Sequence, residues 1–170
     1  NAIYDADAQL LSQAANCPIH LAAMKFSAEA IIEKYSVASM KPEDIYVVND
    51  PYKGGTHIND ITFMMPIFFD DKIIGFGVSR GHWMDLGGGA AGGQAMDGTH
   101  IAGEGLRLPP LKIFSEGEVN QDILDIILNN TRTPHFVKGD LQAHVGCLKA
   151  ADTEIRAAAD RYGIDVLTVA

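Results

Sequence analysis

The chain has 170 residues and a formal net charge of −9, from 13 lysines and arginines against 22 aspartates and glutamates. This acidic balance argues against a nucleic-acid partner, because binding to phosphates needs a basic face. The composition is 47% apolar and 21% charged, which excludes wholesale disorder. No apolar run reaches about 18 residues, so we expect no membrane span, and no signal-peptide pattern is present.

Cys17 and Cys147 lie far apart in the sequence and form no CxxC pair. They match neither a metal-binding spacing nor a disulfide framework, so we expect reduced thiols and a cytoplasmic protein. Both ends of the chain fall inside ordinary structured sequence, and we expect it to be a piece of something longer.

The first third of the chain predicts a hairpin, a helix and a strand. Short alternating segments at 2–5 and 9–13 favour the hairpin. Apolar residues at steps of three and four predict a helix over 21–35. The β-branched and aromatic run 45–48 predicts a strand, which ends where Asn49-Asp50-Pro51 follows.

The centre of the chain predicts a second, longer hairpin. Apolar runs at 61–69 and 72–79 are joined by the acidic pair Asp70-Asp71. Both runs are apolar at most positions, so we expect both faces of these strands to be covered. Pro66 predicts a bulge or a sheet edge within the first of the two strands.

The last third predicts a short strand at 111–114, a helix over 120–130 capped by Asn120, and a long helix from Pro134 that Gly163 ends. Apolar residues at steps of three and four predict a buried stripe along the long helix: Leu141, Val145, Leu148, Ile155, Ala159 and Tyr162. The order of strands and helices is mixed rather than strictly alternating. We therefore expect an α+β fold with a mixed, largely antiparallel sheet, covering helices and a long glycine-rich loop.

Two His/Asp pairs stand at the open end of the long hairpin. His57 and Asp60 precede its first strand, and His82 and Asp85 follow its second. Because antiparallel strands place the start of one beside the end of the other, the two pairs are predicted to converge. Two histidines and two aspartates with open positions suit a catalytic Mn²⁺, Zn²⁺ or Fe²⁺ site. The alternative is hydrogen-bonded His/Asp pairs that fix loops.

Several neighbouring polar residues could join this site or serve structure only. Asp50 could act in catalysis or cap its own turn, as Asx residues do before proline. His20, near the start of a helix, is a reserve ligand that could equally be a packed residue. Lys53 and Arg80 are cations beside the site that could neutralise a carboxylate or an oxyanion, or remain solvated.

The segment 87–105 holds eight of the chain's 17 glycines, together with His100 and Glu104. It matches neither a P-loop nor a dinucleotide-binding pattern. A connection of this length inside a compact domain is usually functional or disordered. The segment could therefore be a lid over the His/Asp site, from which His100 supplies a ligand, or a loop that simply lacks regular structure.

Three ordered motifs carry a resemblance to a known family. They are NDPYxGGTHxxD at 49–60, SRxHxxDxGG at 79–88 and EGLRLPP at 104–110. Together with the flanking segments, they make nearly the whole chain similar to the hydantoinase B family. That family comprises B-type subunits of N-methylhydantoinases and 5-oxoprolinases and the related subunits of acetone and acetophenone carboxylases. Its members are longer, so residues 1–170 resemble a single N-terminal portion of such a protein.

The resemblance implies a hydrolase that opens a cyclic amide C–N bond of a hydantoin or oxoproline within an ATP-dependent hetero-oligomer. It implies a hydantoinase A-type partner that binds ATP and phosphorylates the substrate, and a divalent metal, manganese or zinc, in this chain. By position, Asp60, His82 and Asp85 match the expected ligands. His57 and Asp50 are candidate bases, or residues that orient the ligands.

His100 stands where the family pattern has an acidic residue, which leaves the fourth ligand open among His57, His100 and His20. The alternatives to a hydrolase are a ketone-carboxylase subunit with the same metal site and a non-catalytic scaffold for the ATP-binding partner.

Overall fold

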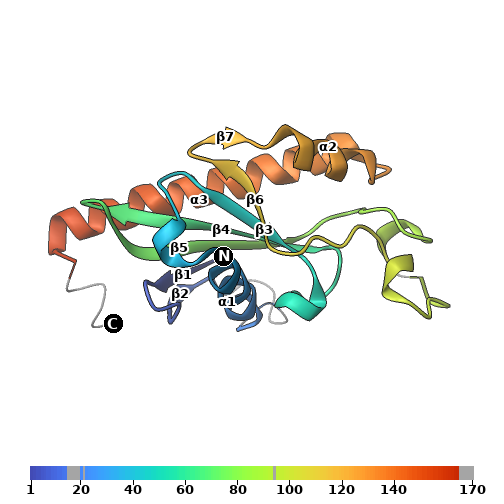
Figure 1. Cartoon of the computed structure of the whole chain (residues 1–170), viewed down its shortest axis with the longest axis horizontal. Helices are drawn as coiled ribbons and strands as arrows, with labels where there is room; N and C mark the ends of the chain where they lie inside the picture. Colours follow the sequence, from blue (N-terminus) through green and yellow to red (C-terminus); the bar gives the residue numbers. More distant parts are fainter. Residues whose placement is uncertain (15–19, 21, 94, 165–170) are drawn as a thin grey trace.

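In the computed structural model, residues 1–14, 20, 22–93 and 95–164 are described. Within them, strands form one sheet in the order β2-β1-β5-β4-β3-β6-β7, and every neighbouring pair is antiparallel (Figure 1). The strands are β1 Ala2–Asp5, β2 Leu10–Gln13, β3 Ile45–Val48, β4 Asp60–Phe69, β5 Lys72–His82, β6 Leu111–Ser115 and β7 Glu118–Val119.

Helices cover both faces of this sheet, so the chain has three layers (Figure 1). The helix α1 (Ala23–Tyr35) packs on one face, and the long helix α3 (Pro134–Tyr162) crosses the other beside α2 (Gln121–Asn129). Short 3₁₀ turns lie in the connections: η2 Val37–Ser39, η3 Pro51–Lys53, η4 Ala91–Gly93 and η5 Ile101–Gly103. The α+β prediction is confirmed. No helix in the described part of the chain is long and apolar enough to cross a bilayer.

The two faces of β4 carry separate apolar cores because side chains alternate along a strand. Met64 packs with Met24 and Ile31 of α1, whereas Phe63 packs with Leu141 and Leu148 of α3. This double burial explains why both strands of the long hairpin are apolar at most positions, as predicted.

The acidic pair Asp70-Asp71 closes the long hairpin with positive φ at both residues. That geometry gives the right twist to a two-residue turn. Pro66 lies in a central strand, beyond the last residue that pairs with β3, and the bulge follows it between Ile67 and Phe68. The missing N–H of the proline is therefore tolerated at a point where β4 has no partner on that side.

The apolar stripe predicted along the last helix is buried or half-buried except at its end. The apolar stripe of α3 is buried at Leu141, Leu148 and Ala159, but Tyr162 is 61% exposed. Its place in the stripe was wrongly predicted, because Tyr162 is the last residue of α3 and its side chain faces solvent. Cys147 is a free, half-buried thiol, and Cys17 lies outside the described residues.

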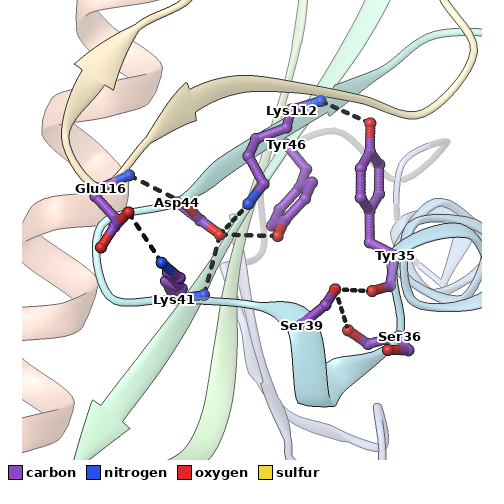
Figure 2. Close-up of polar contacts among 8 residues, drawn as sticks. All are labelled: Tyr35, Ser36, Ser39, Lys41, Asp44, Tyr46, Lys112 and Glu116. Atoms are coloured by element: carbon purple, nitrogen blue, oxygen red, sulfur yellow. Dashed lines mark hydrogen bonds and ion pairs between the residues drawn. The ribbon is translucent and has the colours of Figure 1, made fainter.

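A buried carboxylate fixes β6 against β3 (Figure 2). Asp44 is fully buried and accepts hydrogen bonds from Tyr46 Oη at 3.0 Å, from Lys112 Nζ at 2.5 Å and from the backbone N–H groups of Lys41 and Glu116. Burial alone would raise the pKa of Asp44, but these donors outweigh it and hold the pKa below its usual value. The strand that follows the glycine-rich segment is thus anchored at its far end.

Candidate active site

The long hairpin places Asp60 directly opposite His82, at the open end where β4 begins and β5 ends. His82 Nδ1 lies 3.0 Å from Asp60 Oδ1. The aspartate side chain is 8% exposed and the imidazole 49%, so the pair has one buried and one accessible partner. The predicted convergence of the two loops is confirmed for these residues.

Two more histidines complete a cluster around Asp60. The His57 ring stacks on His82, with centroids 5.4 Å apart and an interplanar angle of 19°. His20 Nδ1 lies 3.9 Å from Asp60 Oδ2, and that oxygen also accepts a hydrogen bond from Thr56 Oγ1 at 2.8 Å. We call His20, His57, Asp60 and His82 the His/Asp cluster.

A turn explains why His57 and Asp60 share one side of the chain. The N–H of Asp60 donates to the carbonyl of His57 at 2.9 Å, which folds the four residues 57–60 back on themselves. Upstream, Gly55 passes so close to the backbone that a Cβ there would lie 2.4 Å from the carbonyl oxygen of Asn49. Glycine at this position therefore lets the loop approach the end of β3.

Asn49 is the buried clamp that holds the surrounding segments together. Its Nδ2 donates to the carbonyls of Ile58 at 2.6 Å and Leu106 at 2.9 Å, and its Oδ1 accepts from the N–H of Leu108 at 2.6 Å. The loop that carries His57 and the segment that returns from the glycine-rich loop are thus fixed side by side. The sequence motif placed Asn49 at a strand end, but nothing in it indicated this role.

Arg80 lies beneath the cluster, because Thr62 and Arg80 form the next cross-strand pair on the face that α1 covers. Arg80 is 7% exposed and donates from Nε to Thr62 Oγ1 and from Nη2 to Ser27 Oγ, both at 2.7 Å. Burial lowers the pKa of Arg80, and the charge of Asp60 opposes this shift. The predicted cation beside the site is present, whereas Lys53 is exposed.

Asp85 lies in a different environment from the His/Asp cluster. Its carboxylate is 3% exposed and accepts from Arg132 Nη1 at 2.6 Å, from the Arg132 N–H at 2.6 Å and from the Gly87 N–H at 3.3 Å. Burial alone would raise the pKa of Asp85, but these hydrogen bonds outweigh it and keep the pKa below its ordinary value. Its contacts join the connection before α3 to the glycine-rich segment. Arg132 was not predicted from the sequence.

Two other predicted site residues also have local partners. Asp50 accepts from the N–H of Tyr52 at 3.0 Å, which is the turn-capping role considered from the sequence, and its Oδ2 lies 3.7 Å from Arg107 Nε. His100 is exposed and its Nδ1 accepts from the N–H of Ala102 at 3.1 Å. His100 therefore caps the turn η5.

The His/Asp cluster contains nitrogen and oxygen donors of the types that bind divalent metal ions. His20 Nδ1 and His57 Nε2 are both buried, and neither has a hydrogen-bond partner among the residues that the structure describes. Buried polar atoms rarely stay unpaired, and imidazole nitrogens beside a carboxylate are the donor types that suit a divalent cation. As the side chains stand, no three His, Cys, Asp or Glu side chains among the described residues are placed to hold a metal ion. The donor types fit, and binding would require side-chain adjustment.

Comparisons with known proteins show which proteins this chain is similar to. The sequence profile described as Hydantoinase B/oxoprolinase matches residues 1–170. The beta subunit of the caprolactamase of Pseudomonas jessenii is 30% identical over 165 residues, which is 97% of this chain and 28% of the relative. An uncharacterised protein of Methanocaldococcus jannaschii is 35% identical over 164 residues, covering 95% of this chain and 29% of the relative.

Two solved structures share the fold. The crystal structure of the ATP-dependent caprolactamase from Pseudomonas jessenii has a TM-score of 0.93 and 28% identity, covering 99% of this chain and 29% of that one. A nucleotide-free acetone carboxylase has a TM-score of 0.88 at 21% identity, over 97% of this chain and 22% of that one, which shows a shared fold. This chain thus spans less than a third of these proteins. The profile match over all 170 residues places the chain in the hydantoinase B/oxoprolinase family.

Proposed function

We propose that the chain is the N-terminal part of a B-type subunit of an ATP-dependent enzyme that hydrolyses a cyclic amide bond at a divalent metal ion. The observation that carries this proposal is the Asp60–His82 pair, with His57 stacked on it and two unpaired imidazole nitrogens beside it. Similarity to the beta chain of a caprolactamase and to the B-type chain of a D-/L-hydantoinase supports the type of reaction.

His57, Asp60 and His82 would hold the metal, which is manganese or zinc by the chemistry of its donors. This set of ligands differs from the one that the family resemblance implied. The Asp85 carboxylate already accepts hydrogen bonds from Arg132, and His100 Nδ1 accepts one from the backbone of its own turn. His57 would serve as the further ligand, since its Nε2 is buried and has no hydrogen-bond partner in the described part of the chain.

When bound, the metal lowers the pKa of a water molecule and polarises the amide. The surrounding residues would hold the metal-binding carboxylate in place. Thr56 Oγ1 holds Asp60 Oδ2, His20 Nδ1 lies 3.9 Å from the same oxygen, and Arg80 supplies a buried positive charge near the carboxylate. Asp50 accepts a hydrogen bond from the N–H of Tyr52, which fixes the turn η3 at the entry to the His57 loop.

A partner subunit of the hydantoinase A type would bind ATP and phosphorylate the amide oxygen before hydrolysis. The caprolactamase and hydantoinase relatives are each named as one subunit of an enzyme, which supports such a partner.

The test uses the full-length protein purified together with its ATP-binding partner. ATP consumption is measured with 5-oxoproline, hydantoin and caprolactam, and separately with acetone plus bicarbonate. The proposal predicts turnover of at least one cyclic amide and its loss in His82→Ala. The matched control is His135→Ala, since His135 is an exposed histidine in the first turn of α3.

Two results would contradict the proposal in different ways. Turnover only with acetone and bicarbonate would make the protein part of a carboxylase. Unchanged turnover and metal content in His82→Ala would make this part of the protein a scaffold for its partner.

A further inference from the structure

A hollow of 420 Å³ lies at the neck of the glycine-rich loop, and neither the metal proposal nor the family resemblance assigns it a role. Its apolar wall comes from Leu86, Ile101 and Leu106, and its polar groups include His100 and Arg107. The lining is about equally polar and apolar, so a hollow of this size could hold a small molecule that has one polar and one apolar part.

The walls of the hollow are held by the backbone. The N–H of Gly89 donates to the carbonyl of Gly103 at 2.7 Å, and the N–H of Leu106 donates to that of Leu86 at 2.8 Å. A Cβ at Gly88 would lie 2.6 Å from the carbonyl carbon of Glu104, so the two sides of the neck approach too closely for any other residue. The segment predicted as a lid or an irregular loop therefore has a fixed neck.

Hydrogen bonds connect one wall of the hollow to the loop that carries His57. Asn49 hydrogen-bonds the carbonyls of both Ile58 and Leu106, which fixes the wall of the hollow beside the residue that follows His57. Arg107 extends toward the turn η3, which precedes the His57 loop. Its Nε lies 3.7 Å from Asp50 Oδ2, and its guanidinium lies 6.0 Å from the centre of the Tyr52 ring.

The lining of the hollow contains a cationic side chain, although the chain as a whole is acidic. Although the net charge is −9, the described residues that line the hollow include Arg107 and His100 and no aspartate or glutamate. Because His100 Nδ1 accepts a hydrogen bond, its neutral ring carries the proton on Nε2 and presents a donor. The ion pair with Asp50 involves Arg107 Nε at 3.7 Å, and the guanidinium donates no hydrogen bond within the described part of the chain, so its terminal N–H groups are available to a ligand.

We propose that this hollow binds the oxyanion group of a small molecule, a carboxylate or a phosphate, through Arg107 and His100, with its apolar part against Leu86, Ile101 and Leu106. The inference deepens the proposed function and rests on it for the identity of the bound molecule, which is the cyclic amide or its phosphorylated form. A carboxylate would come from the substrate itself, and a phosphate from ATP.

The experiment is a calorimetric titration of the full-length protein with its partner, without ATP. The probes are 5-oxoproline, 2-pyrrolidone (the same ring without the carboxylate) and inorganic phosphate. We expect Arg107→Gln to lower the affinity for 5-oxoproline and phosphate at least about tenfold. Arg107→Lys should lower it less, and His100→Gln several-fold. Arg161→Gln, which removes the same charge from the exposed end of α3, is the matched control.

The probes separate the sources of the oxyanion. Tighter binding of 5-oxoproline than of 2-pyrrolidone, dependent on Arg107, supports a substrate carboxylate, and Arg107-dependent binding of phosphate supports a phosphoryl group. His82→Ala separates the hollow from the metal site. Binding that persists in His82→Ala and is lost in Arg107→Gln supports the inference.

Binding lost in His82→Ala and kept in Arg107→Gln would overturn the inference while leaving the metal proposal standing. Absence of binding of both oxyanion probes to the unmodified complex at millimolar concentration would also overturn it. Thermal melting of each variant checks that it is folded.

Discussion

Arg132 Nη1 lies 2.6 Å from Asp85 Oδ1, and this contact joins the connection between α2 and α3 to the start of the glycine-rich segment. The aspartate is buried while the arginine is 48% exposed, and Arg132 also donates to the carbonyls of Gly87 and Gly88. One side chain thus fixes the loop at the point where it leaves β5.

Asp85→Asn is expected to destabilise the full-length protein by about 2–4 kcal/mol, because it removes a buried charge that accepts hydrogen bonds from two N–H groups and a guanidinium. The free energy of unfolding in urea measures this. The exposed Asp7→Asn serves as control and should change it by less than about 0.5 kcal/mol. Equal stability of Asp85→Asn and the unmodified protein would contradict a structural role for this contact.

His144 should make stability depend on pH. It lies between α3 and the sheet, with Nδ1 2.7 Å from Ser79 Oγ, and burial lowers its pKa to about 4. The unfolded chain, with a pKa near 6.5, binds the proton first, so stability is full above about pH 6.5 and falls toward pH 4 by up to about 3 kcal/mol. Unfolding free energies across this range should fall less steeply in His144→Gln, and parallel curves would contradict the assignment.

Asp44→Asn tests the network of Figure 2. We expect a loss of about 3–5 kcal/mol, because the partly buried Lys112 would then lie against a neutral group. Tyr46→Phe removes only one of the donors to Asp44 and should cost about 1–2 kcal/mol. Because the pKa of Asp44 is lowered in the folded state, its contribution is present above about pH 4 and is lost as the pH falls further. Chemical denaturation measures the free energy of unfolding of both variants. A larger loss in Tyr46→Phe than in Asp44→Asn would contradict this description.

Thr56→Val tests how the carboxylate of the cluster is held. Thr56 Oγ1 donates to Asp60 Oδ2 at 2.8 Å, and residues that orient a ligand typically contribute about 10–100-fold to metal affinity. We expect the variant to bind metal about tenfold more weakly, measured by competition with a chelator. Thr153→Val on the exposed side of α3 is the control. Equal affinity of both variants would show that Asp60 is positioned without Thr56.

The sequence predicted the hairpin and the meeting of its ends because strand pairing is a local property. Once 61–69 and 72–79 pair through a two-residue turn, the register places Asp60 against His82. His57 joins them because a turn reverses the chain between His57 and Asp60. Both steps follow from residues close in sequence.

Asp85 shows where the same reasoning stops. The two His-x-x-Asp pairs look alike in sequence, but a hydrogen-bonded turn brings His57 and Asp60 together. His82 instead ends a strand, the chain bends at Met84, and no backbone hydrogen bond between described residues closes a turn from His82 to Asp85. Arg132, the partner of Asp85, lies 47 residues further along the chain, and no local pattern indicates such a contact.

The metal content of the full-length protein, purified with its partner, is the most direct test of the proposed site. Elemental analysis should find one divalent ion per chain, lost in His57→Ala and in His82→Ala, and retained in Asp85→Asn because that carboxylate serves Arg132. Retention of the metal in His57→Ala together with its loss in Asp85→Asn would contradict the site proposed here.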